Sequence, residues 1–191
     1  MHGKVAWVTG GATGIGRETA RAPALEGAHV VISGRREVEL GLTVQELTAH
    51  GLKVSALPLD VSDAAAVGDA SRQIEDTLGT VSVLVCSAGK NMPKRFWNDL
   101  ALDGYRQIVG VNLHGVVYCV HTVLQGMRAQ RDVLIVIMSS WAGREFLPIA
   151  GMAYGGSKTV LSPLTESIPT SRKAGTAYAP RCSCLANLRR R

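Results

Sequence analysis

The sequence predicts an α/β fold in which helices cover both faces of a parallel sheet. Short apolar runs that stop at glycine or polar residues are typical of buried strands, and here they alternate with longer segments of helical periodicity. Such alternation is typical of parallel strands joined by right-handed crossovers. The five expected strands cover Lys4–Thr9, His29–Ser33, Lys53–Leu59, Val81–Cys86 and Val133–Ser139.

The expected helices lie between these strands, at about residues 15–26, 37–50, 63–78 and 103–130, with a further helix around 154–168. Asp63 is expected as the N-cap of the third helix. Two prolines, Pro23 and Pro163, fall inside expected helices. An interior proline removes a helical hydrogen bond and costs about 3 kcal/mol or more.

Length and charge indicate one neutral domain with a basic tail. The 191 residues, 46% of them apolar, are enough for one sizeable core. From Arg172 onward there are six basic residues and no acidic ones, which leaves 15 basic against 15 acidic residues in 1–171. We therefore expect a domain at 1–171, an atypical tail at 172–191 and no nucleic-acid partner, because a basic face on the folded part is missing. The alternative is that the tail itself is an interaction module.

Composition also favours a cytoplasmic protein. No apolar run approaches the ~20 residues of a membrane span, so no membrane association is expected. The four cysteines show no paired framework, which fits a reducing compartment. Cys182 and Cys184 are too close together for the usual metal-binding pair, and no metal site is expected.

A glycine-rich turn, Gly10–Gly16, joins the first expected strand to the first helix. Glycines at such a junction allow a tight turn and let a ligand approach the backbone. The start of the helix then offers N–H groups and the positive end of its dipole to a pyrophosphate. The alternative is a simple turn, but the position between strand and helix favours a dinucleotide site.

Arg35 follows the second strand, about 20 residues after the glycines. In a Rossmann unit this point faces the adenosine ribose, where a carboxylate would repel a 2′-phosphate. No carboxylate lies between the second strand and Glu37, and an arginine can bind phosphate with two hydrogen bonds. The sequence thus favours NADP over NAD, although NAD remains open; the alternative is that Arg35 and Arg36 are merely solvated.

Tyr154 and Lys158 are four residues apart, and on a helix this spacing puts both side chains on one face. A lysine ammonium beside a phenol favours the phenolate and so helps the phenol to exchange a proton. A serine hydroxyl, from the pair Ser139–Ser140, could polarise a carbonyl. The alternative is an exposed pair without chemistry. Because Gly10, Asp60, Gly89 and Ser140 all lie at strand ends, we expect them to converge on one crevice.

Taken together, these residues resemble the short-chain dehydrogenase/reductase family. Thr9–Gly16 resembles its TGxxxGxG turn, Asp60-Val61 its adenine contact, Val111-Asn112-Leu113 its active-site Asn motif, and Ser140, Tyr154 and Lys158 its catalytic serine and YxxxK. The resemblance runs from about Lys4 to Ile168 and implies a Rossmann-type doubly wound sheet. It also implies a homo-oligomer through the long helices carrying Asn112 and Tyr154.

The resemblance implies hydride transfer between the nicotinamide and a small carbonyl or secondary alcohol. Tyr154 would be the general acid or base, Lys158 would favour its phenolate and bind the nicotinamide ribose, Ser140 would hold the substrate oxygen, and Asn112 would anchor a proton-relaying water. Thr13 and Arg35 would meet the 2′-phosphate. The implied cofactor-binding residues are Gly10, Thr13, Gly14, Ile15, Gly16, Arg35, Asp60, Val61, Ala88, Gly89, Tyr154 and Lys158.

The chain departs from the family pattern in two places. Cys86-Ser87-Ala88-Gly89 stands where the family has Asn-Asn-Ala-Gly, and Lys173–Arg191 matches none of the last strands or the substrate-covering loop. We therefore expect a sheet that lacks the last strands, with Val133–Ser139 nearer its edge. The alternative function is a truncated, non-catalytic dinucleotide-binding remnant. Trp141, Arg144 and Phe146 are the expected substrate contacts.

Overall fold

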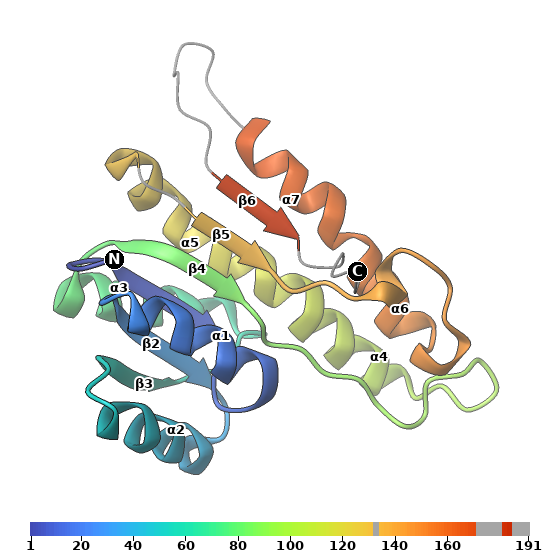
Figure 1. The fold of residues 1–191 in the computed structure, drawn as a ribbon. Coiled ribbons are helices and arrows are strands. Elements are labelled where there is room, and N and C mark those ends of the chain that lie inside the picture. Colours follow the sequence, from blue (N-terminus) through green and yellow to red (C-terminus); the bar gives the residue numbers. More distant parts are fainter. Residues whose placement is uncertain (132–133, 171–180, 185–191) are drawn as a thin grey trace, which may run out of the picture.

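The computed structural model describes residues 1–131, 134–170 and 181–184, and its centre is a six-stranded parallel sheet in the order β3-β2-β1-β4-β5-β6 (Figure 1). The order confirms the Rossmann-type class, since both halves of the sheet are wound outward from β1 and β4. The strands are β1 (Val5–Thr9), β2 (His29–Gly34), β3 (Val54–Pro58), β4 (Val81–Cys86), β5 (Leu134–Ile137) and β6 (Arg181–Cys184).

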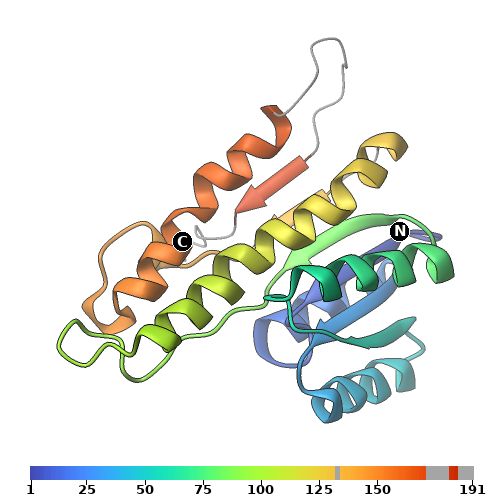
Figure 2. The same ribbon diagram turned by 180° about the vertical axis from the view of Figure 1, so that it is seen from behind.

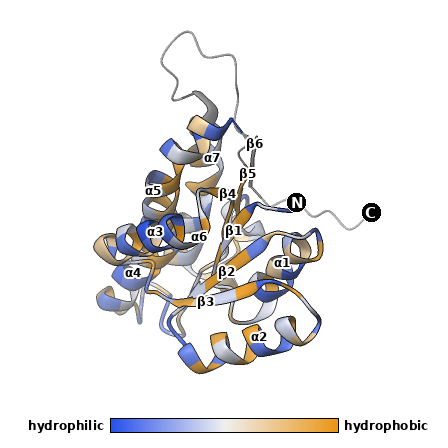
Figure 3. Cartoon of the chain, turned by 90° about the vertical axis from the view of Figure 1, so that its left-hand side faces the viewer, coloured by the Kyte–Doolittle hydropathy of each residue, from blue (hydrophilic) through white to orange (hydrophobic). Residues whose placement is uncertain are grey.

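Helices cover both faces of the sheet, as seen from behind and edge-on (Figures 2 and 3). α1 and α2 lie on one face, whereas α3, α5 and α7 lie on the other. The α-helices are α1 (Gly14–Leu25), α2 (Glu37–Ala49), α3 (Ala64–Leu78), α4 (Leu102–Val109), α5 (Gly115–Gln130), α6 (Met152–Thr159) and α7 (Leu161–Thr170). As expected, Asp63 caps α3, because its Oδ1 accepts hydrogen bonds from the amides of Ala65 and Ala66.

Strand alternation divides the apolar core into two clusters. Val5 and Trp7 of β1 point toward α3 and α5, whereas Ala6 and Val8 point toward α1 and α2. Successive side chains of a strand point to opposite faces, so a strand buried on both faces is apolar throughout. This explains why β1 and β4 read as continuous apolar runs in the sequence.

The long helical segment Leu102–Gln130 contains one turn of π-helix, η1 (Gly110–His114), between α4 and α5. By length and composition this segment alone, among the described residues, could cross a membrane. Its apolar side chains are engaged in the fold, however: Val116, Cys119 and Val123 are buried in the cluster shared with α3 and β4. The π-turn carries Asn112, and such turns frequently occur at functional sites.

The sequence predicts one continuous helix around residues 154–168, but the structure has a break in it just before Pro163. α6 ends at Thr159 and α7 begins at Leu161, with Val160 between them. Proline has no N–H, so Pro163 cannot bond the carbonyl of Thr159, and the first helical bond of α7 runs from the Leu164 amide to the Val160 oxygen. Pro23, by contrast, is accommodated near the end of α1.

The expected tail contributes one strand that the sequence did not predict. Arg181–Cys184 forms β6, which pairs in parallel with β5 in the register Leu134↔Arg181 to Ile137↔Cys184. β5 is therefore not at the edge of the sheet, because main-chain hydrogen bonding covers its outer side. The other residues of the expected tail, 172–180 and 185–191, lie outside the described residues.

Candidate active site

A cleft of about 720 Å³ lies at the carboxyl ends of the strands, where the order reverses between β1 and β4. It extends from the ends of β2 and β3 across the glycine turn to α6. Residues from several separate segments line it, namely Gly10, Ala12, Thr13, Ile15, Gly16, Gly34, Arg35, Arg36, Leu59, Asp60, Val61, Ser87, Ala88, Gly89, Lys90, Asn91, Val111, Met138, Ser139, Tyr154 and Lys158. Of the four strand-end residues expected to converge, Gly10, Asp60 and Gly89 line the cleft, whereas Ser140 does not.

The glycine turn has a separate physical reason at each of three positions. Gly10 has φ +69°, and a Cβ there would lie 2.7 Å from the Ala88 backbone. A Cβ at Gly16 would lie 2.1 Å from the Gly10 oxygen, so only glycine lets the helix pack against the turn. Gly14 has φ +56°, but a Cβ there would meet nothing within 4 Å, so Gly14 keeps open space in front of the turn.

The start of α1 is free to meet an anion. Thr13 is its N-cap, but no side chain caps the first helical N–H groups. Instead, the Thr13 hydroxyl accepts a hydrogen bond of 2.9 Å from Nη2 of Arg36. Uncapped amides and the positive end of the helix dipole suit a phosphate group, and the cleft has the size of a nucleotide site.

Two arginines frame the end of the cleft near β2 and β3. Nη1 of Arg35 lies 3.8 Å from Asp60, whereas Nη1 of Arg36 pairs with Glu39 at 3.1 Å. The sequence interpretation singled out Arg35 and treated Arg36 as part of a solvated pair. In the structure Arg36 is the arginine bonded to Thr13 beside the turn. The one feature of the sequence that could have indicated this contact is the position of Arg36 next to Arg35.

The Asp60 carboxylate at this end is held in its charged form. Partial burial raises its pKa, but hydrogen bonds from the Ser62 hydroxyl and amide and the positive charges of Arg35 and Lys90 outweigh burial and hold the pKa below its ordinary value. The Ser62 bonds measure 2.6 and 2.9 Å. Val61 lies beside Asp60, buried, and also lines the cleft.

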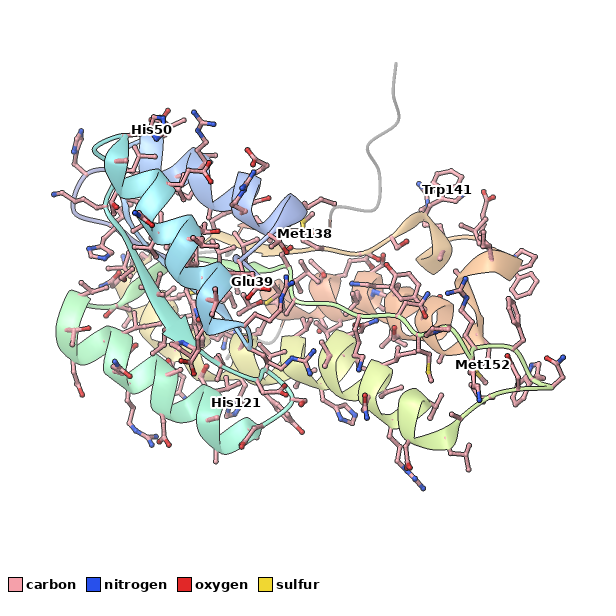
Figure 4. All side chains as sticks on the ribbon, turned by 90° about the horizontal axis from the view of Figure 1, so that it is seen from below. Glu39, His50, His121, Met138, Trp141 and Met152 are labelled. Carbon is pink, nitrogen blue, oxygen red and sulfur yellow. The ribbon has the colours of Figure 1, made fainter. Side chains whose placement is uncertain are left out.

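Tyr154 and Lys158 stand on α6 at the opposite end of the cleft. Nζ of Lys158 lies 5.9 Å from the centroid of the Tyr154 ring. The lysine is buried, at 5% exposure, and donates a hydrogen bond of 2.7 Å to the main-chain oxygen of Met138. In Figure 4, where the molecule is seen from below, the labelled Met138 lies between Glu39 and Trp141. Lys158 therefore brings a buried positive charge to the cleft.

The two serines at the end of β5 have different roles in the structure. Ser139 lines the cleft, and its hydroxyl donates to the Lys158 oxygen at 3.0 Å. Ser140 is not among the lining residues; its Oγ accepts a bond of 3.3 Å from the Ala142 amide and so caps the short helix η2 (Trp141–Gly143). An oxygen that accepts in this way still carries its own proton to donate.

Asn112 is fully buried behind the cleft and holds the loop that follows β4. Its Oδ1 accepts from the Lys90 amide at 2.8 Å, and its Nδ2 donates to the Lys90 oxygen at 3.0 Å and to the Ser157 hydroxyl at 3.1 Å. Both amide protons are thus engaged. A Cβ at Gly89 would lie 3.5 Å from this Oδ1 and 3.7 Å from Nζ of Lys158, so glycine keeps the space between them open.

Cys86, at the position where the sequence departs from the family pattern, is an internal thiol. The hydrogen bond with the Cys119 thiol and burial raise the pKa of Cys86 well above its ordinary value, and the nearby charge of Lys158 opposes this only in part. The thiol is therefore neutral. It packs with Ile137 and Cys119 in the core and does not line the cleft.

Large apolar side chains are exposed on two loops at the α6 end of the cleft. Trp97 is 78% and Phe146 81% exposed, and the guanidinium of Arg144 lies 5.8 Å from the ring centroid of Trp141. A bond of 2.9 Å from Nδ2 of Asn91 to the Ala150 oxygen joins the two loops. Exposed apolar groups that gather in this way indicate a contact surface.

Comparison with known proteins gives a consistent result. The family model described as short chain dehydrogenase matches residues 4–173. A curated relative, 2-dehydro-3-deoxy-L-rhamnonate dehydrogenase (NAD(+)) of Sphingomonas sp. (strain SKA58), is 34% identical over 87% of this chain and 65% of its own length. The chain spans less than two thirds of the length of the first curated relatives that it matches.

Solved structures resemble this one closely. A short chain dehydrogenase/reductase from Burkholderia phymatum in complex with NAD superposes with a TM-score of 0.87 at 30% identity, covering 96% of this chain and 64% of the other. A metagenomic short-chain oxidoreductase in complex with NADP gives a TM-score of 0.84 at 28% identity, covering 89% of this chain and 76% of the other. Both nicotinamide dinucleotides therefore occur among the structural neighbours.

Proposed function

The chain belongs to the short chain dehydrogenase family, and from this premise we propose that it transfers a hydride between NADP(H) and a carbonyl or secondary alcohol. One observation carries the proposal: Tyr154 and Lys158 line the same cleft as the glycine turn that begins α1. A proton-transfer pair thus faces a dinucleotide-sized space. When bound, the nicotinamide cofactor supplies the hydride that is exchanged with the substrate carbon.

Tyr154 is the proposed general acid in reduction and general base in oxidation. Lys158, buried and with Nζ 5.9 Å from the centre of the Tyr154 ring, is the proposed cationic partner of the tyrosine oxygen during proton transfer. Ser140 is the proposed donor to the substrate oxygen, because its hydroxyl proton is not needed for capping η2. Asn112 is the proposed anchor for proton relay through a lone pair of Oδ1, since both its N–H groups are already engaged.

The residues of the cleft suit a phosphorylated dinucleotide. The uncapped N–H groups at the start of α1 would bind the pyrophosphate. Asp60 and Val61 would contact the adenine, and Ala88 and Gly89 would lie behind the cofactor. Arg35 and Arg36, together with Thr13, are proposed to bind the 2′-phosphate of NADP, because Arg36 bonds the Thr13 hydroxyl and both arginines line this end of the cleft.

The substrate is proposed to be apolar where it meets the loops beside α6. Trp141, Arg144 and Phe146, from the loop between Ser140 and Tyr154, are the proposed contacts. The aromatic rings offer apolar area, and the Arg144 guanidinium lies 5.8 Å from the centroid of the Trp141 ring. A second copy of the chain is proposed to pair through the long helices carrying Asn112 and Tyr154.

The test is NADPH oxidation by the purified protein with a panel of apolar aldehydes and ketones. Tyr154→Phe is expected to lower kcat by roughly 10²- to 10⁴-fold, the usual contribution of a general acid, while NADPH affinity is retained. Tyr105→Phe is the matched control, because it also removes one phenolic hydroxyl but lies outside the cleft lining.

The outcomes distinguish the two functions. Undiminished turnover by Tyr154→Phe would contradict the mechanism. Calorimetric binding of NADPH without turnover of any member of the panel would favour the alternative, a non-catalytic dinucleotide-binding protein of the same fold.

A further inference from the structure

Ser157, one residue before Lys158, connects the catalytic helix to the π-turn. It is buried, at 4% exposure, and its hydroxyl makes two hydrogen bonds. The hydroxyl donates to the main-chain oxygen of Tyr154 at 2.8 Å and accepts from Nδ2 of Asn112 at 3.1 Å. Ser157 does not line the cleft, so its hydroxyl acts on the site through its hydrogen bonds to Tyr154 and Asn112.

The two Ser157 bonds require the same orientation of the Asn112 amide as its two bonds to the Lys90 main chain. The proton of the Ser157 hydroxyl is committed to the Tyr154 oxygen, so its oxygen can only accept on the side facing Asn112. Nδ2 must therefore point toward Ser157. Oδ1 is then directed at the Lys90 amide, from which it accepts at 2.8 Å. If the Asn112 amide were reversed, its NH₂ group would face the N–H of Lys90, and two donors would meet without an acceptor.

Asn112 is thus the centre of a three-way connection. Its side chain binds the main chain of Lys90 through both Oδ1 and Nδ2, and it binds α6 through Ser157. The backbone around it is π-helical, a geometry that is rare and depends on its surroundings. The loop after β4, the π-turn and the helix of Tyr154 are joined at this one amide.

We propose that Ser157 is a positioning residue, which ties the Asn112 amide to α6 and thereby sets the geometry between the π-turn, the Lys90 loop and Tyr154. The proposal rests on the proposed oxidoreductase function for its kinetic consequence, but its structural part does not. Because Ser157 acts on the placement of the proton-transfer groups, its loss affects kcat and leaves cofactor binding unchanged.

Ser157→Ala removes the bridging hydroxyl. Thr165→Val is the matched control: Thr165 is equally buried, at 4% exposure, and its hydroxyl bonds the Leu161 oxygen at 2.6 Å within α7. Both variants delete one buried hydroxyl bonded to a helix carbonyl, so both report the general cost of that deletion. Only Ser157→Ala also removes a hydrogen-bond acceptor from the Asn112 side chain.

The kinetic arm measures kcat, KM and the NADPH dissociation constant. Ser157→Ala is expected to lower kcat about tenfold, in line with the loss of one positioning hydrogen bond, with less than about a twofold change in the dissociation constant. Thr165→Val is expected to leave all three values within about twofold of the wild type. Equal kcat for the two variants would overturn the proposal.

The structural arm uses NMR of the side-chain amide of Asn112, assigned with Asn112→Ala. In the wild type its protons are expected to exchange slowly, and in Ser157→Ala to exchange faster and shift, with no change in Thr165→Val. Rapid exchange in the wild type, comparable to that of the exposed Asn98, would overturn the proposal even if Ser157→Ala failed to fold. Absence of turnover in the wild type together with a slowly exchanging amide would contradict the proposed function and still support the positioning role.

Discussion

Nζ of Lys158 lies 2.7 Å from the main-chain oxygen of Met138 and donates a hydrogen bond to it. This bond ties α6 to the chain just beyond β5, because Met138 follows the last residue of that strand. The Ser139 hydroxyl adds a second connection in the opposite direction, to the oxygen of Lys158. The buried ammonium is therefore fixed both to the sheet and beside Tyr154, and its removal has consequences for stability and for activity.

Lys158→Met is expected to abolish most turnover, by roughly 10²-fold or more, because Tyr154 loses its proposed cationic partner in proton transfer. Unfolding free energy is expected to fall by about 1–3 kcal/mol, since the Met138 oxygen loses its partner in a buried site. Steady-state kinetics and urea denaturation measure the two effects. Lys53→Met, at an exposed position before β3, is the control, and turnover of Lys158→Met equal to that of this control would contradict the assignment.

Arg36→Ala is expected to weaken NADPH binding about tenfold while NADH binding changes little, because a charge-assisted bond to phosphate is lost. Arg35→Ala is expected to do the same, with a smaller effect on NADPH, since Arg35 lies nearer Asp60 than Thr13. Calorimetric titration with each cofactor measures this. Arg21→Ala, exposed on α1, serves as the control. Equal losses for NADPH and NADH would contradict a 2′-phosphate site.

Three glycine substitutions distinguish glycines required for packing from a glycine that leaves room for the cofactor. Gly16→Ala is expected to destabilise the protein by several kcal/mol, because its Cβ would lie 2.1 Å from the Gly10 oxygen. Gly14→Ala has no such clash and is expected to cost about 1 kcal/mol through its φ of +56°, while cofactor binding weakens. Gly41→Ala, on the exposed side of α2, is expected to stabilise the protein by about 0.5–1 kcal/mol.

Thermal unfolding and NADPH titration of the three variants provide the measurement. If Gly14→Ala bound NADPH as tightly as Gly41→Ala, the turn would not be the place where a ligand approaches the backbone.

The Asp60 carboxyl is expected to titrate below the ordinary value of about 3.9. Burial raises the pKa of Asp60, but the Ser62 hydrogen bonds and the charges of Arg35 and Lys90 lower it by more than burial raises it. A depressed pKa in the folded state means that Asp60 stabilises the protein at pH above the ordinary value, and that this contribution is lost as pH falls through the folded-state pKa. Because the side chain is 41% exposed, the effect on stability is small.

NMR titration of the Asp60 carboxyl carbon follows this directly. Arg35→Ala is expected to raise the pKa of Asp60 toward the ordinary value, whereas Arg21→Ala is expected to leave it unchanged. An unaltered titration in Arg35→Ala would show that the 3.8 Å pair carries no interaction in solution.

Local patterns in the sequence were sufficient for most of the fold. β4 covers Val81–Cys86, the range expected from its apolar run, because a strand buried on both faces is predominantly apolar, with Ser82 as the one polar residue here. The glycine turn was recognised because its special backbone angles require glycine. The break at Val160 and the strand β6 were not predicted. Arg181–Cys184 has no apolar run, and its pairing with β5 depends on long-range main-chain hydrogen bonds.

The candidate site was predicted in part. All the expected cofactor residues except Gly14 line the cleft, as do Tyr154 and Lys158. Arg36, Ser139 and Ser157 were missed, because their contacts depend on side-chain direction. Arg36 and Arg35 are neighbours in the sequence, but one binds Thr13 and the other faces Asp60.

The sequence by itself determined β1 to β5, most of the helices and which residue types meet at the strand ends, because periodicity, glycine positions and helical spacing act over a few residues. Only the tertiary structure decided how these groups are held. The Asn112 amide and the Ser157 hydroxyl are 45 residues apart, and their bond depends on the packing of a π-turn against α6. Hydrogen-bond direction and burial arise from that packing, which no local pattern encodes.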